Sequence, residues 1–239
     1  MRWREWNELP KGFRVPEVRE YYDILSKKKF SLRMKRCFDV IVAAVMLVCL
    51  SPIMLMIALA IVLDSPGGVF YRQERVTQYG KVFRIHKFRT MVSNADKIGT
   101  QITVENDSRI TKIGGVLRKY RLDEIPQLLD VLNGSMSYVG TRPEAVKYVK
   151  KYKPEYYATL FLPAGITSET SIRYKDEAEL LEAADDVDRV YVEDVLPGKM
   201  KYNLQSIKEF SFVGEIKTMF RTVFAVLGKD YSDKEQERV

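Results

Sequence analysis

The sequence predicts an α+β protein that is mostly helical and associated with a membrane, and three observations support this class. Residues 40–63 carry no charged side chain, which indicates a membrane segment. Residues 69–91 combine β-branched and aromatic residues around a turn, which predicts a small β-hairpin or short sheet. Helical patterns fill much of the remaining sequence. The 239 residues suffice for one sizeable domain, and no Pro- or Gly-rich linker divides it.

Residues 1–34 mix many Arg and Lys side chains with the aromatic residues Trp3, Trp6, Phe13, Tyr21 and Tyr22. This composition is typical of a segment that lies along lipid headgroups. A partly disordered arm is the alternative. We therefore predict an interfacial or flexible N-terminal arm.

Residues 35–66 are predicted to hold a re-entrant membrane helix. The apolar run is too long, and too far from the N-terminus, to be a secretory signal peptide, so we expect the protein to retain it. Ser51 and Pro52 lie almost at its centre, where Pro removes a backbone donor and predicts a bend. Each arm is then about eleven residues, or roughly 16 Å, which is about half of a hydrocarbon core.

Basic residues flank both ends of this segment, which by the positive-inside tendency places both ends in the cytoplasm. They are Lys27, Lys28, Lys29, Arg33, Lys35 and Arg36 before it, and Arg72, Arg75, Lys81 and Arg84 after it. A re-entrant hairpin satisfies the short arms and the charge pattern together. A kinked helix that spans the bilayer is the alternative, since Pro is tolerated in such helices.

Residues 67–239 are predicted to form a cytoplasmic catalytic region with amphipathic helices at its C-terminal end. The turn of the hairpin is expected at Gln78-Tyr79-Gly80. Helical patterns cover residues 113–122, 126–132, 144–151 and 176–188. A last one, over residues 215–227, has apolar side chains at a 3.6-residue period and suits either a core or a bilayer surface.

Composition restricts the chemistry. The formal charge of +7 suits anionic lipid, nucleic acid or phosphorylated substrates equally well. Cys37 and Cys49 both lie at or inside the apolar stretch, so neither a disulfide framework nor a Cys-rich zinc site is plausible. The single histidine, His86, is more often structural, and it leaves carboxylates to hold a metal, which would be a hard cation such as Mg²⁺.

The most informative stretch, residues 117–134, places Asp123 and Glu124 before a short helix opened by Pro126. Such carboxylates often only cap a helix. Here Arg118, Lys119 and Arg121 surround the pair, which itself has the ligands to hold a divalent cation. Carboxylates, a metal and several cations are what phosphoryl transfer requires.

Two further basic segments fit this chemistry. Lys87 and Arg89 would point to the same side of a strand and form a candidate phosphate site. Gly140 and Pro143 fix a turn that would aim the guanidinium of Arg142 from a rigid loop. Taken singly, each basic group is more often solvated surface or a lipid-headgroup contact.

Six sequence blocks carry a family resemblance. They are KRCFD (35–39), SP (51–52), DSPGGVFYRQER (64–75), KVFRIHKFRTM (81–91), SRITKIGGVLRKYRLDEIPQLLDVLNG (108–134) and MSYVGTRPE (136–144). Together they resemble the bacterial sugar transferases, the monotopic phosphoglycosyl transferases that begin exopolysaccharide, O-antigen or glycoprotein glycan assembly. The resemblance covers roughly residues 35–167.

The resemblance implies a re-entrant helix bent at Ser51-Pro52, and a covalent phosphosugar intermediate on Asp123 with Glu124 assisting through Mg²⁺ or proton transfer. It also implies that Arg118 and Lys87 bind phosphate and that the loop Thr141-Arg142-Pro143 contacts uridine. Lys35, Arg36 and Asp39 would anchor the start of the hairpin at the membrane interface.

Three segments depart from the family pattern. Gly134-Ser135 replaces Gly-Asp, and Thr141-Arg142-Pro143 replaces Pro-Arg-Pro. Residues 168–175 read Ser-Glu-Thr-Ser-Ile-Arg-Tyr-Lys where the family has Gly-Trp-Ala-Gln-Val-Asn-Gly-Arg. Since the carboxylate pair is intact, these departures bear on donor and sugar recognition more than on the type of reaction.

We therefore predict an enzyme that moves a sugar phosphate from a UDP-sugar to undecaprenyl phosphate at the cytoplasmic face of the bacterial inner membrane, with membrane lipid as a further partner. A non-catalytic membrane-tethered module that binds anionic lipid or recruits other enzymes is the rival interpretation. No nucleic-acid partner is expected, because the basic residues flank an uncharged membrane segment. The sugar, the polyprenol, the pathway and the oligomeric state stay open, with a homodimer as one alternative.

Overall fold

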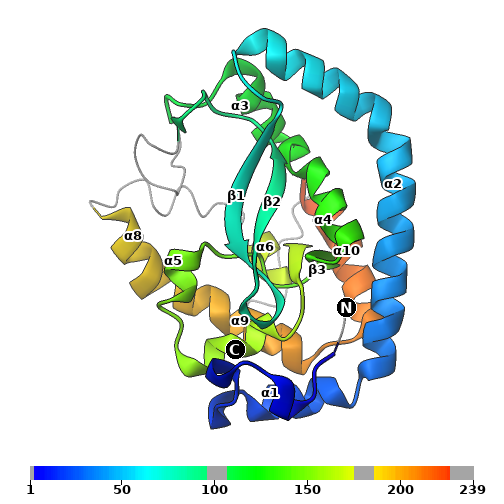
Figure 1. Ribbon diagram of the computed structural model, residues 1–239, viewed down its shortest axis with the longest axis vertical. Helices are drawn as coiled ribbons and strands as arrows, with labels where there is room; N and C mark the ends of the chain where they lie inside the picture. Colours follow the sequence, from blue (N-terminus) through cyan, green and yellow to red (C-terminus); the bar gives the residue numbers. More distant parts are fainter. Residues whose placement is uncertain (1–2, 96–106, 175–185, 227–239) are drawn as a thin grey trace.

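The computed structural model describes residues 3–95, 107–174 and 186–226. Helices dominate it, and two small sheets lie among them, in agreement with the predicted class (Figure 1). The α-helices are α1 (Pro16–Ser26), α2 (Lys29–Asp64), α3 (Lys112–Lys119), α4 (Leu128–Asn133), α5 (Val146–Val149), α6 (Glu169–Arg173), α8 (Val187–Val190), α9 (Leu196–Lys208) and α10 (Phe212–Val226). The strands are β1 (Phe70–Val76), β2 (Val82–Phe88), β3 (Met136–Val139) and β4 (Ala164–Thr167). Tighter helical turns are η1 (Trp6–Glu8), η2 (Lys11–Phe13), η3 (Gln78–Gly80), η5 (Leu122–Gln127) and η6 (Pro154–Leu160), and η7 (Tyr191–Val195) is a π-helical turn.

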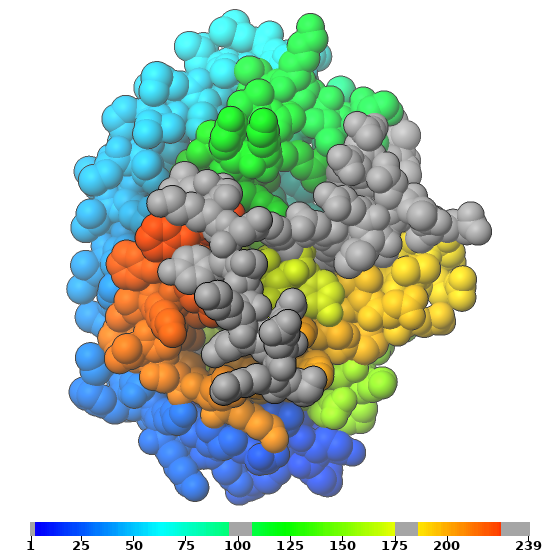
Figure 2. All heavy atoms as spheres, turned by 180° about the vertical axis from the view of Figure 1, so that it is seen from behind, coloured from blue at the N-terminus to red at the C-terminus, as the bar shows by residue number. Residues whose placement is uncertain are grey.

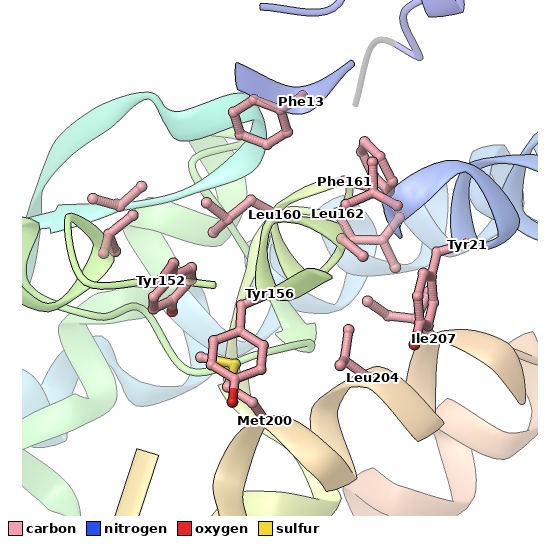
Figure 3. Packing of buried hydrophobic residues seen from close by; sticks show 14 of the residues in the cluster. Phe13, Tyr21, Tyr152, Tyr156, Leu160, Phe161, Leu162, Met200, Leu204 and Ile207 are labelled. Atoms are coloured by element: carbon pink, nitrogen blue, oxygen red, sulfur yellow. The ribbon is translucent and has the colours of Figure 1, made fainter. Parts of the chain in front are cut away.

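The N-terminal segment packs against the protein core from Trp3 onward, so its described residues are ordered, and its position at a membrane interface stays a prediction. Figure 3 shows Phe13 and Tyr21 among apolar side chains of η6 and α9. Tyr22 and Leu25 on α1 belong to the same cluster and are 5% and 0% exposed. The aromatic rings of α1 are thus covered by protein, because this helix lies against η6 and α9.

Helix α2 is one continuous helix that runs through Pro52. Figure 1 shows it following one side of the molecule and then turning across the top. The Ser51 hydroxyl donates a hydrogen bond of 2.8 Å to the Val48 carbonyl, a back-bond of the kind that accompanies helix bending. By length and composition α2 is able to cross a membrane, and Leu55 and Leu63 are 73% and 78% exposed. The re-entrant path through a bilayer stays a prediction.

The predicted β-hairpin is confirmed. Strands β1 and β2 pair antiparallel, with Tyr71 opposite Lys87 and Arg75 opposite Phe83. The turn falls at residues 78–80, as predicted, where Gly80 has a φ of 76°. A second sheet, in which β3 and β4 pair in parallel, was not predicted. Its strands have four residues each and β3 is buried on both faces, so β3 shows no alternating pattern to detect.

Several helices differ in extent from the prediction. Helix α3 ends at Lys119, before the predicted Leu122, because Arg121 takes a left-handed conformation with a φ of 55°. Helix α4 starts at Leu128, two residues after the predicted start, and ends at Asn133, where Gly134 caps it with a φ of 89°. The helix predicted over residues 144–151 shrinks to α5.

The predicted C-terminal amphipathic helix is confirmed as α10, which begins three residues earlier than expected, at Phe212 rather than Glu215. Figure 2 shows it on the face opposite the hairpin, and the ring of Phe212 lies 5.8 Å from that of Phe38 on α2. Most of the helix predicted over residues 176–188, and Leu227, lie outside the described residues.

Candidate active site

Asp123 and Glu124 lie on η5 and line a cavity of about 1280 Å³. The left-handed Arg121 redirects the chain from α3 into this short turn. η5 packs against β2, which brings the pair close to Lys87. Both residues are nearly buried, at 8% and 9% exposed, so an ionised carboxylate here is destabilised unless a cation or a hydrogen-bond donor lies beside it.

Glu124 has two cationic partners. The Lys87 ammonium donates a hydrogen bond of 2.7 Å to Oε1, and the Arg142 guanidinium donates one of 2.5 Å to the same atom. Burial on its own would raise the pKa of Glu124, but the charges and hydrogen bonds of Arg142 and Lys87 hold it well below its usual value. Glu124 is therefore ionised and holds two cations in the cavity.

Asp123 differs from its neighbour. Its Oδ2 lies 4.0 Å from the Lys87 ammonium, beyond hydrogen-bond distance. Burial raises the pKa of Asp123, the charge of Glu124 adds to this, and Lys87, Arg118 and Arg142 offset it only in part. The pair thus splits into a strongly ionised Glu124 and a more basic Asp123, as is common where two carboxylates take different roles.

The predicted phosphate ligands separate into two groups. Lys87 and Arg118 line the cavity, and the charge of Arg118 acts on Asp123. Arg89 also lines it, but its guanidinium donates to the carbonyls of Ser65 and Pro66 at the end of α2, at 2.7 and 2.6 Å. β2 ends at Phe88, so the alternation that placed Arg89 beside Lys87 does not reach it. In this structure Arg89 caps a helix.

His86 takes the structural role predicted for it. Its Nδ1 lies 2.8 Å from Asp130 Oδ1, and its backbone N–H donates to Oδ2 of the same carboxylate. Asp130 is 1% exposed. The contact fastens β2 to α4 behind the carboxylate pair.

The loop Thr141-Arg142-Pro143 follows β3, where the backbone of Gly140 approaches that of Gly165 so closely that a Cβ on Gly165 would lie 2.2 Å from Gly140. Thr141 also accepts a backbone hydrogen bond of 2.9 Å from Gly165. This close backbone packing holds the loop of Arg142 rigid, as the predicted turn at Gly140 and Pro143 requires. Arg142 reaches into the cavity, while Thr141 and Pro143 are not among its lining residues.

The residues predicted as membrane anchors bind protein groups in the structure. Lys35 donates a hydrogen bond of 2.8 Å to the last carbonyl of β3 and also pairs with Glu215 on α10. Asp39 accepts a hydrogen bond of 2.7 Å from the Ser137 hydroxyl. Arg36 donates to two carbonyls in the last turn of α4, at 2.5 and 2.9 Å. These side chains fasten α2 to the body of the protein, whereas Ser51 and Pro52 are exposed.

The sequence patterns did not predict a row of polar side chains in the cavity. Tyr71, Gln73 and Arg75 alternate along β1, on the face that carries Lys87, and Glu144 and Lys199 lie beyond them. The period of two along β1 was a usable signal, since it would have extended the Lys87 site. Lys199 comes from a distant helix and had no such signal.

The opposite side of the cavity is apolar. It is lined by α2 at every fourth residue, and by α10 at helical spacing: Phe38, Val42, Met46, Leu50, Ile216, Met219, Phe220 and Val223. The carboxylate pair lies in the same cavity, so one space joins a charged site to an apolar wall. Such a space suits a substrate with a charged head and a hydrocarbon tail.

The segment that departs from the family pattern helps to build this cavity. Residues 168–174 include α6, where the Ser168 side chain caps the helix by accepting a hydrogen bond of 2.9 Å from the Ser171 backbone. Glu169 binds Arg221 on α10 at 2.8 Å. Thr170 and Ser171 line the cavity. Lys175 lies outside the described residues.

Comparison with known proteins agrees with the six sequence blocks. The family model of the bacterial sugar transferases matches residues 30–229. The chain belongs to this family. This bacterial sugar transferase is 38% identical over 196 residues to the UDP-glucose:undecaprenyl-phosphate glucose-1-phosphate transferase of Escherichia coli. The match covers 80% of this chain and 39% of that protein.

Two other relatives are similar. The UDP-N-acetylgalactosamine-undecaprenyl-phosphate N-acetylgalactosaminephosphotransferase of Aeromonas hydrophila is 34% identical, over 81% of this chain and 43% of that protein. The UDP-glucose:undecaprenyl-phosphate glucose-1-phosphate transferase of Caulobacter vibrioides is 34% identical, over 82% of this chain and 70% of that protein. This sugar transferase spans about two fifths of the length of the first two relatives.

The transferase offers two carboxylates for a metal. Among the described residues, no three His, Cys, Asp or Glu side chains gather closely enough to hold an ion. Mg²⁺ in phosphate chemistry usually takes one or two carboxylates and completes its shell with water and substrate phosphates. Asp123 and Glu124 supply that number of carboxylates and would be the residues to hold such an ion.

Proposed function

We propose that this sugar transferase moves a sugar 1-phosphate from a UDP-sugar to undecaprenyl phosphate and releases UMP. The observation that carries the proposal is the convergence of Asp123, Glu124, Lys87, Arg118 and Arg142 on one cavity. Two carboxylates surrounded by cations match a reaction in which a nucleophile meets a diphosphate. The names of the relatives describe the same transfer. The reaction would be the first membrane step of exopolysaccharide, O-antigen or glycoconjugate assembly.

In the proposed mechanism, a carboxylate oxygen of Asp123 attacks the phosphorus that bears the sugar. A bond forms between this oxygen and phosphorus, and the phosphoanhydride bond breaks, so that UMP leaves with the bonding electron pair. A phosphate oxygen of undecaprenyl phosphate then attacks the same phosphorus, and Asp123 departs as a carboxylate. The raised pKa of Asp123 supports this assignment, because a more basic oxygen is a better nucleophile once ionised.

Glu124 has a positioning role in this scheme. It holds Lys87 and Arg142 at 2.7 and 2.5 Å, so both cations are oriented before a donor arrives. When the diphosphate binds, they and Arg118 stabilise the charge that develops on its oxygens. Mg²⁺ held by Asp123 or Glu124 together with the diphosphate would supply further charge neutralisation.

The placement at the membrane is part of the proposal. Arg36 fastens the first part of α2 to α4, and Arg89 fastens the end of α2 next to β2, so both ends of α2 meet the same body. In addition, Leu25 before α2 and Leu204 after it share one core cluster. A re-entrant helix with both flanks in the cytoplasm satisfies these contacts, whereas a spanning helix would divide the core. The apolar wall of the cavity then faces the lipid tail of the acceptor.

The test is a single turnover without acceptor. The purified protein is mixed with Mg²⁺ and, separately, with UDP-glucose, UDP-galactose and UDP-N-acetylgalactosamine, and UMP and protein mass are measured. We expect about one UMP per enzyme and a covalent phosphosugar adduct with the right donor. Asp123→Asn removes the nucleophilic charge and should abolish both, whereas the exposed Asp194→Asn should change neither.

The outcomes separate the parts of the proposal. Glu124→Gln should slow the burst by roughly 10² to 10³, because it removes the anchor of two oriented cations. Full turnover with undecaprenyl phosphate but no adduct in the wild type would exclude the covalent step alone. Absence of UMP from every donor, with and without acceptor, would refute the function.

A further inference from the structure

The cavity extends well beyond the carboxylate pair, along the inner face of the hairpin. Tyr71 pairs with Lys87, so the row of side chains Tyr71, Gln73 and Arg75 begins next to Glu124. Four residue steps from Tyr71 to Arg75 cover about 13 Å at roughly 3.3 Å per residue. Arg142, which binds Glu124, also acts on Arg75 through its charge, so the far end of the row borders the reacting site. The chemistry proposed above uses neither Gln73 nor Arg75.

Buried polar side chains from three elements meet at this far end. Lys199 and Asn203 are one turn apart on α9 and are 5% and 4% exposed, and Thr170 on α6 is 2% exposed. Glu144 follows the loop of Arg142, and its side chain is 11% exposed. All four line the same cavity as Asp123. Polar groups buried to this degree are costly unless hydrogen-bonded, so their partners are informative.

The hydrogen bonds of Glu144 are one-sided. The Tyr191 hydroxyl donates to Oε1 at 2.6 Å, and the Lys199 ammonium donates to the same atom at 3.2 Å. Within the described residues, no hydrogen bond reaches Oε2. Burial would raise the pKa of Glu144, but the charges of Lys199 and Arg75 and the hydrogen bond from Tyr191 lower it. The far end thus presents an ionised carboxylate with one oxygen unused.

Asn203 is also incompletely used. Its Oδ1 accepts a hydrogen bond of 2.7 Å from the Thr170 hydroxyl. Its Nδ2 has a contact of 3.9 Å with the sulfur of Met200, which is a weak acceptor. The amide therefore retains donors for a ligand, one helical turn from Lys199.

A carboxylate acceptor next to amide and guanidinium donors is suited to hydroxyl groups, because each hydroxyl both donates and accepts. A divalent cation is disfavoured here, since Lys199 and Arg75 already place positive charge beside Glu144. A phosphate is disfavoured by the carboxylate itself. Vicinal hydroxyls of a sugar ring match this set of groups better than either ion.

We propose that Glu144 Oε2, Asn203 Nδ2 and Arg75 bind the hydroxyl groups of the donor's sugar ring and so select the sugar. The inference rests on the proposed function, because it takes the UDP-sugar to be the ligand. Glu144 and Asn203 are specificity residues in this scheme, held in place by Tyr191, Lys199 and Thr170. A site built to hydrogen-bond a hydroxyl discriminates strongly against a sugar that lacks or inverts it.

The test compares recognition of the sugar with recognition of the nucleotide. Glu144→Gln and Asn203→Ala are assayed against UDP-glucose, UDP-galactose and UDP-N-acetylgalactosamine, and UDP and UMP are measured as inhibitors. We expect kcat/KM for the preferred donor to fall about 10- to 100-fold and the preference among the three to shrink. The inhibition constants of UDP and UMP should change less than threefold. Glu74→Gln, on the exposed face of β1, is the matched control and should behave as wild type.

Other outcomes overturn the inference. An equal loss toward UDP, UMP and all donors would make this the uridine site. An unchanged preference among donors, together with a lowered thermal midpoint, would show that the cluster is structural. If Glu144→Gln does not fold, Asn203→Ala serves as the milder variant. If the wild-type protein releases no UMP from any donor, the proposed function itself is refuted. If the wild type is active and both variants keep its donor preference, only the inference about the sugar site is refuted.

Discussion

The ammonium of Lys87 lies 2.7 Å from Oε1 of Glu124 but 4.0 Å from Oδ2 of Asp123. One cation thus binds the neighbour of the proposed nucleophile and acts on the nucleophile through its charge. Burial lowers the pKa of Lys87, and the charges of Glu124 and Asp123 oppose this, so the protonation of each group depends on the charge of the others.

Lys87→Met should therefore shift the acid limb of the pH–rate profile. The charge of Lys87 lowers the pKa of both Asp123 and Glu124, so its removal makes both carboxylates ionise at higher pH. We expect the acid limb of kcat/KM to move upward in pH and the plateau to fall by roughly 10² to 10³. Lys87→Arg should restore part of the profile. Lys81→Met, at an exposed position, is the control, and an unmoved acid limb in Lys87→Met would contradict the coupling.

Adjacent glycines in α3 provide a matched pair for stability. A Cβ on Gly114 would lie 2.0 Å from the Thr90 carbonyl oxygen, whereas a Cβ on Gly115 would meet nothing within 4 Å. Gly114→Ala should lower the free energy of unfolding by about 1 to 3 kcal/mol through overpacking. Gly115→Ala should be neutral or add up to about 1 kcal/mol from helix propensity.

Chemical unfolding in detergent, followed by circular dichroism, measures both changes. Because α3 also carries Arg118, Gly114→Ala should reduce activity as well, while Gly115→Ala should leave it intact. Equal stability of the two variants would show that the chain near Thr90 relaxes freely.

Residues placed by local sequence patterns were predictable, whereas residues placed by contacts distant in sequence were not. Asp123, Glu124 and Lys87 were predictable, because a short motif and one strand place them. Arg89 binds carbonyls at the end of α2, since β2 ends one residue before it, and a single-residue boundary is beyond what a sequence pattern resolves. Its binding of phosphate stays a prediction. Glu144 was expected in a helix, yet its backbone is not helical and its side chain enters the cavity.

Long-range contacts explain the remaining differences. Lys35 and Asp39 look like interfacial residues from their neighbours in sequence, but their partners lie about 100 residues away on β3. Lys199 contacts Glu144 across 55 residues. No local periodicity reports such pairs. The parts of the cavity that the family resemblance did not describe are therefore the parts built by tertiary packing.

Glu215 predicts a pH dependence of stability. It pairs with Lys35 at the contact between α10 and α2, and burial raises the pKa of Glu215 to about 7, although Lys35 opposes this. A carboxyl with a raised folded-state pKa stabilises the fold fully below its unfolded value and loses that contribution as pH rises through its folded value. The window is therefore from about 4.5 to about 7. The loss is on the order of 3 kcal/mol.

Glu215→Gln mimics the protonated form and should lack this pH dependence. Relative to wild type, the variant should gain stability as pH rises from 4.5 to 7 and remain level above that. Thermal unfolding at matched pH values measures the difference, with the exposed Glu209→Gln as the control. Parallel curves for Glu215→Gln and wild type across the window would contradict a raised pKa.

The path of α2 through the bilayer is tested by labelling both of its flanks. Single cysteines at Arg33 and Gly68, in a background with Cys37 and Cys49 replaced, lie at exposed positions, and a side chain at Gly68 meets no neighbour within 4 Å. Because α1 and α9 share a core on either side of α2 in sequence, both cysteines should react only from the cytoplasmic side. Reaction of one of them from the periplasm would demonstrate a spanning helix. Replacing Ser51-Pro52 by Ala-Leu restores a straight helix of about 36 Å over residues 40–63, which favours spanning. In part of the population, that variant should expose the cysteine at position 68 to the periplasm. Activity should fall in the same proportion, because a spanning α2 separates the N-terminal segment from the core against which it packs.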